Sequence, residues 1–202
     1  MVPVKLREFR NDWYRPGASA LARMAWFFFG LPLLRSAWMP SSAVRVWLLR
    51  RFGARIGRGC VIKPGVRVKY PWRFRMGNDC WLGEDCWIDN LAPVGLGDDV
   101  CISQGAYLCT GNHQWDDPRF ALIVRPIRLG SGAWAGAKSV LCPGVSVGRC
   151  GIVCAGAVAM RTVPAYEIHG GNPAHFLRLR RFQSSTLSHK ENTSCNELSL
   201  QA

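Results

Sequence analysis

The polar stretch CTGNHQWDDP, residues 109–118, holds a histidine, His113, between two segments rich in small and aliphatic residues. An unperturbed imidazole has a pKa of ~6.5 and can therefore accept a proton from a hydroxyl group near neutral pH. A carboxylate or a backbone carbonyl must hold such an imidazole in one tautomer, and Asp89, Asp116 and Asp117 are the candidate carboxylates. Asp116 and Asp117 are equally typical of an ordinary turn. The surrounding elements must decide between a catalytic base and a loop residue.

Length and charge bound the classes of protein to which the chain can belong. With 202 residues and 49% hydrophobic content, it can form one main domain with a buried core and short extensions. The 26 basic and 13 acidic residues give a formal net charge of +13, which favours nucleic acid, an anionic membrane surface, or a phosphorylated cofactor or substrate as partner. The basic residues are spread along the chain and no nucleic-acid-binding motif stands out, so we expect no nucleic acid partner.

The cysteines and the apolar runs favour a cytoplasmic location. Nine cysteines are an odd number without a CxxC pair, and no signal peptide is evident, which predicts a reducing compartment. The most apolar run, residues 24–34 (MAWFFFGLPLL), contains Pro32 and is much shorter than the roughly 20 residues that a membrane-crossing helix needs. Residues 1–52 mix arginines with tryptophans, so they could lie at the inner face of the cytoplasmic membrane or pack on the main domain as an amphipathic helical pair.

An aliphatic residue recurs at every sixth position between Ile56 and Ala159. The exceptions are two spacings of eight residues and one longer gap. A period of six fits neither a helix nor a long alternating strand, but it suits very short strands joined by tight turns, three to a coil. Coils of this kind stack at roughly 4.8 Å, pair their backbones in parallel and bury the aliphatic column. The predicted inward residues are, coil by coil, Ile56, Ile62 and Val68; Met76, Leu82 and Ile88; Leu96, Ile102 and Leu108; Leu129, Ala135 and Leu141; Val147, Val153 and Ala159.

A second column of small or β-branched residues stands two positions before the first. Cys60, Cys80 and Cys86 belong to it, and we interpret them as core residues rather than metal ligands. Glycine often follows the aliphatic residue, as at Gly83, and Gly, Asn and Asp elsewhere tolerate the left-handed backbone that corners require.

This repeat resembles that of the bacterial hexapeptide-repeat acyltransferases. The segments WYRPG at 13–17, PSSAVRVWLLRRFGARIG at 40–57, WIDNLAPV at 87–94 and ISQGAYLCTGNH at 102–113 are similar to those of the colanic acid biosynthesis acetyltransferase subgroup. That group is associated with O-acetylation of exopolysaccharide sugars.

The resemblance implies an all-β main domain. We expect a left-handed parallel β-helix of about five coils over residues 53–164, preceded by an N-terminal helical, amphipathic segment over 1–52. We expect residues 165–182 to close the prism and to include a short C-terminal helix. Residues 183–202 show no apolar period and are predicted to be a disordered tail.

The longer gap in the repeat places His113 in an unusual position. From Leu108 to Leu129 the spacing is 21 residues instead of six or eight, so a loop over residues 109–128 should leave the rigid prism just where His113 lies. The resemblance implies that this histidine is the base of an acetyl-CoA-dependent O-acetyltransferase. The acetyl group would pass directly to a sugar hydroxyl in a ternary complex, and Cys109, which has no evident activating partner, would form no acyl-enzyme.

The remaining site residues are also implied by the resemblance. Asn90, Asp89 and Asp116 are candidates for binding the acceptor, with a capped corner turn as the alternative for the pair in WIDN. The long arm of coenzyme A needs small walls, and the phosphates need basic groups. The expected cofactor residues are Trp134, Gly136, Ala137, Ala155 and Gly156 along the arm, with Lys138, Arg161, His175 and Arg178 for the phosphates.

We expect a homotrimer with active sites at subunit interfaces and no metal. A zinc enzyme on the same fold would need three histidines in the coils, and only His113 lies there. The acceptor could be a free sugar, a nucleotide sugar or a lipid-linked glycan. A non-catalytic β-helix scaffold in a polysaccharide assembly complex is the competing interpretation, and it would predict loss of the TGNH sequence, which is intact.

Overall fold

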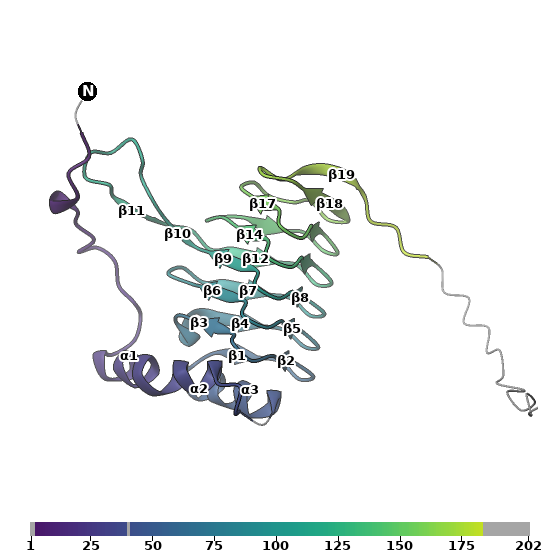
Figure 1. Ribbon diagram of the computed structural model, residues 1–202, viewed down its shortest axis with the longest axis horizontal. Coiled ribbons are helices and arrows are strands. Elements are labelled where there is room, and N and C mark those ends of the chain that lie inside the picture. The colour runs from purple at the N-terminus through teal and green to yellow at the C-terminus, as the bar shows by residue number, and fades with distance from the viewer. Residues whose placement is uncertain (1–2, 40, 184–202) are drawn as a thin grey trace, which may run out of the picture.

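The computed structural model describes residues 3–39 and 41–183. Figure 1 shows a column of stacked short strands with helices across its first end and a narrow arm leaving its side. Most of the strands form the three faces of a prism, each a parallel sheet apart from one antiparallel strand at the far edge of the second face. The first face contains β1 (Arg55–Ile56), β4 (Phe74–Met76), β7 (Val94–Leu96), β12 (Ile127–Leu129) and β15 (Ser146–Val147).

The second and third faces repeat this arrangement. The second face contains β2 (Val61–Ile62), β5 (Trp81–Leu82), β8 (Cys101–Ile102), β13 (Trp134–Ala135), β16 (Ile152–Val153) and, at its far edge, β18 (Glu167–Gly170) and β19 (His175–Leu179). The third face contains β3 (Arg67–Val68), β6 (Trp87–Asp89), β9 (Tyr107–Cys109), β14 (Val140–Leu141) and β17 (Val158–Ala159).

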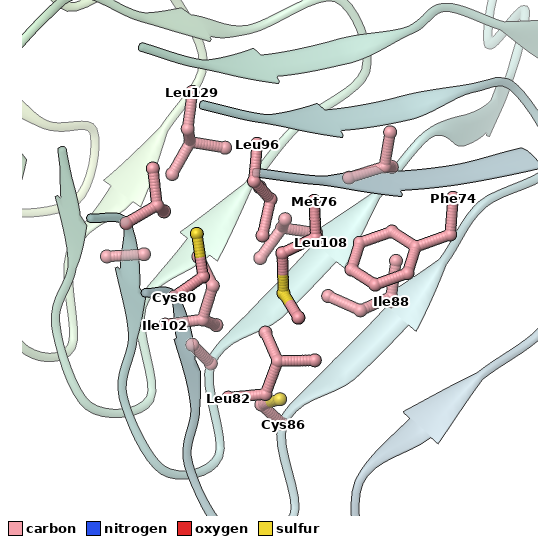
Figure 2. Close-up of a cluster of buried hydrophobic side chains, with 14 of the residues drawn as sticks. Phe74, Met76, Cys80, Leu82, Cys86, Ile88, Leu96, Ile102, Leu108 and Leu129 are labelled. Carbon is pink, nitrogen blue, oxygen red and sulfur yellow. The ribbon is translucent and has the colours of Figure 1, made fainter. Parts of the chain in front are cut away.

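The hexapeptide column forms the core, as predicted. All fifteen residues of the column are buried, at 9% exposure or less, and residues such as Leu82, Ile102 and Leu108 meet along the prism axis in Figure 2. The small-residue column lies beside them, and Cys80 and Cys86 are buried within it. The chain makes about six turns rather than five, because Val163 pairs with Val147 and β18 with β16 to begin a sixth.

The glycines that follow the aliphatic residues permit close stacking rather than unusual backbone angles. A Cβ atom on Gly83 would lie 2.6 Å from the backbone nitrogen of Gln104 in the next coil, too close for any side chain. The left-handed positions fall elsewhere in the corners, where φ is +57° at Asp85 and +66° at Gly105. Close stacking of the coils and the left-handed backbone of the corners are therefore provided by different residues of each turn.

Helices cover the first coil. After the short η1 (Leu6–Glu8), the chain forms α1 (Ala20–Ala25), the π-helix η2 (Trp26–Gly30), α2 (Leu31–Arg35) and α3 (Ser42–Arg51). The Ser19 and Ser41 hydroxyls cap α1 and α3. Trp26 is buried and its indole N–H donates to the Val68 carbonyl at 3.0 Å, which fixes the helices to the prism. Within the described ranges, no helix has the length and apolarity needed to cross a membrane.

The inserted segment is an arm with its own short ladder. β10 (Gly111–His113) and β11 (Leu122–Val124) pair antiparallel, with His113 opposite Leu122. On either side of the insertion the prism is continuous, since β9 pairs with β14 and β12 pairs with β7. We call residues 110–126 the arm.

The prediction of a short helix within residues 165–182 is wrong. β18 instead extends the second face, and β19 turns back to pair antiparallel with it after the Gly171–Ala174 turn. The backbone groups at the open edge of the sheet need partners, and pairing with β19 supplies them for β18. The predicted tail lies outside the described residues apart from Gln183.

Candidate active site

His113 is held in one orientation by the arm itself. Its Nδ1 atom lies 2.8 Å from the carbonyl oxygen of Phe120. Because a carbonyl can only accept, Nδ1 carries a proton, and in the neutral imidazole Nε2 then keeps the lone pair. The Phe120 ring stacks on the imidazole at 4.2 Å with an interplanar angle of 7°, and the Phe9 ring meets it edge-on at 5.5 Å. The arrangement leaves Nε2 as an oriented proton acceptor.

The turn that supplies this carbonyl has an unusual backbone. Phe120 adopts φ +53°, a left-handed conformation that is rare for a bulky residue. Its N–H donates to the Asp117 carbonyl at 2.8 Å, and the Asp117 carboxylate accepts from the backbone N–H of Arg119 at 2.9 Å. This backbone hydrogen bond lowers the pKa of Asp117. Asp117 therefore shapes the turn, and Phe120 rather than an aspartate fixes the tautomer.

Sequence reasoning missed a second support of the arm, the irregular segment 3–19, which includes η1 and which we call the strap. The Lys5 N–H donates to the Pro118 carbonyl at 2.9 Å, and the Tyr14 hydroxyl donates to the Leu91 carbonyl at 2.9 Å. Burial raises the pKa of Tyr14 to about 12. The strap thus connects the arm to the corner that follows β6, and the motif WYRPG is the sequence signal that lies in it.

Arg73 and Trp72 hold the strap against the prism. The Trp72 indole donates to the Pro16 carbonyl at 2.7 Å, and the Arg73 guanidinium donates to the Tyr14 hydroxyl at 2.9 Å. Arg73 also contacts the carbonyls of Leu91 and Arg15. The strap has no repeating sequence pattern, and its position is fixed by hydrogen bonds to side chains and carbonyls of the folded prism.

The three predicted acceptor-binding residues have different surroundings. Asn90 is fully buried, and its amide exchanges hydrogen bonds of 2.9 and 2.7 Å with the backbone of Tyr70, so the structure gives it the turn-capping role. Asp89 accepts from the Tyr107 hydroxyl at 3.0 Å and lies 2.9 Å from the Lys69 ammonium. Asp116 is exposed on the arm and contacts the Gln114 amide. Only Asp116 lies on the arm with His113.

Five of the predicted coenzyme A residues lie together at the corner between the second and third faces. Gly136, Ala137 and Lys138 form the turn from β13 to β14, and Ala155 and Gly156 form the turn from β16 to β17 directly above it. The Gly156 N–H donates to the Ala137 carbonyl at 2.8 Å, and a Cβ atom on Gly156 would meet nothing within 4 Å. At this edge the small residues Ala155 and Gly156 are exposed, Ala137 is half-buried and Gly136 is buried, while Lys138 adds an exposed charge.

The other predicted coenzyme A residues spread from this edge. Trp134 is 42% exposed on β13, with its indole N–H donating to the Ser103 hydroxyl at 2.8 Å. His175 pairs with Gly170 just above the Ala155 turn, and Arg178 lies further along β19. Arg161 follows β17 and lies at the corner between the third and first faces. The structure thus separates Arg161 from the other predicted phosphate ligands.

His113 and the coenzyme edge lie at different corners of the prism. The arm leaves where the third face meets the first, whereas the coenzyme edge is where the second meets the third. One face of about six residues spans at most ~20 Å, so the whole width of the third face separates the two corners. Within one chain, His113 and the predicted coenzyme edge therefore lie apart.

Comparison with known proteins identifies the class to which the chain belongs. No model of a known protein family matches the chain. The colanic acid biosynthesis acetyltransferase WcaF of Escherichia coli K12 is 34% identical over 166 residues, covering 81% of this chain and 90% of the relative. A hexapeptide-repeat acetyltransferase from Vibrio cholerae, solved with acetyl coenzyme A, has a TM-score of 0.73 and 25% identity over 88% of this chain and 96% of its own. A galactoside acetyltransferase solved with coenzyme A has a TM-score of 0.70 and 21% identity, covering 80% and 82%, and shows the shared fold.

The stacked hexapeptide coils and these relatives define the class of hexapeptide-repeat acetyltransferases. Enzymes of this class are acyltransferases. Within it, the chain belongs to the WcaF family of colanic acid biosynthesis acetyltransferases.

Proposed function

We propose that the protein transfers an acetyl group from acetyl-CoA to a hydroxyl of a sugar or glycan precursor in exopolysaccharide biosynthesis, with His113 as general base. The observation that carries this proposal is the Nδ1 contact of His113 with the Phe120 carbonyl, because it directs a basic Nε2 atom away from the turn. The relationship to WcaF supports the glycan class of acceptor.

The reaction needs one proton acceptor and no covalent enzyme intermediate. Nε2 of His113 takes the hydroxyl proton as the acceptor oxygen attacks the thioester carbonyl, and the C–S bond breaks when the tetrahedral intermediate collapses. The imidazolium returns the proton to the departing thiolate of coenzyme A. Cys109 is not required, and its thiol contacts the Gly111 carbonyl at 3.0 Å.

The donor is proposed to bind along the edge formed by Gly136, Ala137, Lys138, Ala155 and Gly156. The Vibrio cholerae acetyltransferase was solved with acetyl-CoA and the galactoside acetyltransferase with coenzyme A. Both share the fold, which supports this class of donor. Lys138, His175 and Arg178 are suited to the phosphates, while the position of Arg161 at another corner favours a role outside this group. Asp116 is the remaining proposed acceptor contact.

A homotrimer would bring the two halves of the site together. His113 and the coenzyme edge lie at different corners of one prism. In a trimer, the arm of one subunit could face the edge of its neighbour, and the two together would form one active site. The supply of acetyl-CoA places the proposed reaction in the cytoplasm.

The decisive experiment measures thiol release from acetyl-CoA by the purified protein with a panel of sugars, nucleotide sugars and lipid-linked glycans. For the variant His113→Ala we expect a rate about 10² to 10⁴ times lower with the best acceptor. His169→Ala is the matched control, because His169 contacts Glu167 at 2.8 Å outside the arm, and it should retain activity.

Full activity of His113→Ala would remove the general-base assignment. If acetyl-CoA neither bound nor reacted with any acceptor, the non-catalytic scaffold in a polysaccharide assembly complex would become the better interpretation.

A further inference from the structure

The net charge of the chain arises in one segment. Residues 13–78 contain thirteen of the 26 lysines and arginines and no aspartate or glutamate. The other thirteen basic residues are balanced by the 13 acidic residues of the rest of the chain, so this segment accounts for the whole +13. It comprises α1 to α3 and the first coil, which lie together at the helical end of the column in Figure 1.

The same end exposes large apolar side chains. Phe27, Phe28 and Phe29 of η2 are consecutive and are 63%, 61% and 69% exposed. Around them lie further exposed apolar residues, and together we call this set the aromatic surface: Leu21, Met24, Phe27, Phe28, Phe29, Leu33, Trp38 and Trp47. These exposed side chains come from neighbouring helices at one end of the molecule, and a concentration of exposed apolar groups is typical of an interaction site.

A basic hollow adjoins the aromatic surface. It has a volume of about 720 Å³ and lies between the helices, where Phe27 and Phe28 line it, and the third face of the prism. Arg23, Arg35 and Arg67 also line it. The Nε atom of Arg67 is buried and has no hydrogen-bond partner among the described residues, so the guanidinium keeps an unused donor beside the hollow.

We infer that the aromatic surface docks on an anionic lipid bilayer, with the aromatic rings in the headgroup region and Arg23, Arg35 and Arg67 against lipid phosphates. Aromatic and aliphatic groups next to arginines are the combination that binds such an interface, with the apolar side buried by about 5–10 Å. A second copy of the chain is a poorer occupant, because a self-complementary contact would bring two acid-free basic surfaces together. This inference does not depend on the catalytic proposal.

The test is co-sedimentation of the full chain with vesicles of phosphatidylcholine alone or mixed with phosphatidylglycerol, without acetyl-CoA. We expect binding to the mixed vesicles and little to the neutral ones. The triple variant Phe27→Ser, Phe28→Ser, Phe29→Ser should lose binding. The variant Arg23→Gln, Arg35→Gln should bind the anionic vesicles roughly 30-fold more weakly, as expected for two charges near the surface.

Matched controls remove exposed groups elsewhere. The double variant Leu177→Ser, Phe182→Ser changes two side chains that are 59% and 63% exposed near the C-terminal strand, and Arg149→Gln removes an exposed charge from the fifth coil. Both should bind vesicles like the unchanged protein. Failure of the unchanged protein to bind, or equal binding by the triple serine variant, would overturn the inference. A triple variant that binds normally but changes oligomeric state would reassign the surface to self-association.

Discussion

At the scale of single residues, the proposed chemistry depends on one backbone carbonyl. Phe120 contributes its carbonyl to Nδ1 of His113 and its ring to the face of the same imidazole, and it does both from a left-handed backbone conformation. Such a conformation persists only where surrounding contacts enforce it, and it is a recognised feature of functional sites. The hydrogen bonds of Asp117 and Lys5 in the same turn supply that enforcement.

Two substitutions of Phe120 should separate the carbonyl from the ring. Both Phe120→Gly and Phe120→Val remove the stacking, but glycine adopts φ +53° freely whereas a β-branched residue is strained there by about 1–2 kcal/mol. We expect kcat to fall about tenfold further in the valine variant than in the glycine variant, because relief of the strain moves the carbonyl away from Nδ1. Equal kcat values in steady-state assays would show that the ring, and not the carbonyl, matters.

The sequence predicts the position of His113 but not the group that orients it. The histidine is marked by its place at the break in the hexapeptide period, whereas a backbone carbonyl has no residue type that could reveal it. For the same reason Asp116 and Asp117 were natural candidates, since their carboxylates are visible in the sequence and the Phe120 carbonyl is not. Asn90 shows a different difficulty: the sequence cannot distinguish an asparagine that caps a corner from one that binds a sugar. The hydrogen bonds of its amide to the Tyr70 backbone reveal the capping role.

At the scale of the elements, the stability of the prism depends on how closely the backbones of successive coils approach each other. Gly83→Ala should destabilise the prism by about 1–3 kcal/mol, because its Cβ atom would collide with the backbone of Gln104. Gly95→Ala is the control: Gly95 is also in the prism, but a Cβ atom there meets nothing within 4 Å and the backbone φ is not left-handed. It should be neutral or slightly stabilising. The measurement is the thermal unfolding midpoint at fixed protein concentration, and equal midpoints for both variants would contradict the stacking argument.

The periodic coils could be predicted residue by residue, whereas the strap and the C-terminal strand could not. Every inward residue of the coils follows from the period of six, because burial repeats with the same period as the chain. The strap has no period, and its hydrogen bonds to Pro118 and Leu91 join residues far apart in sequence. The expected C-terminal helix was wrong because the open edge of the second face, which local sequence does not encode, recruits β19 as a strand.

At the scale of the whole molecule, the separation of His113 from the coenzyme edge predicts complementation between subunits. The variants His113→Ala and Ala155→Phe should each be inactive, the second because a phenyl ring would obstruct the proposed donor site at the exposed edge beside Gly156. Co-expressed with different tags and purified through both, the mixed oligomers should regain activity, because an intact arm can face an intact edge across an interface. Mixed oligomers as inactive as their parents would place the whole site within one chain.

The uninterrupted pairing around the arm has a consequence for how this protein can change. β12 continues the first face from β7, and β14 continues the third face from β9, as if residues 110–126 were absent. Insertions, deletions and substitutions between β10 and β11, beyond the buried Thr110 that bonds to Asp89 and Ala92, therefore leave the ladders of the prism intact. Under the proposed function, the scaffold and the acceptor-facing arm are separable modules. Natural variation in the arm could then change the acceptor of the proposed reaction while the prism folds as before.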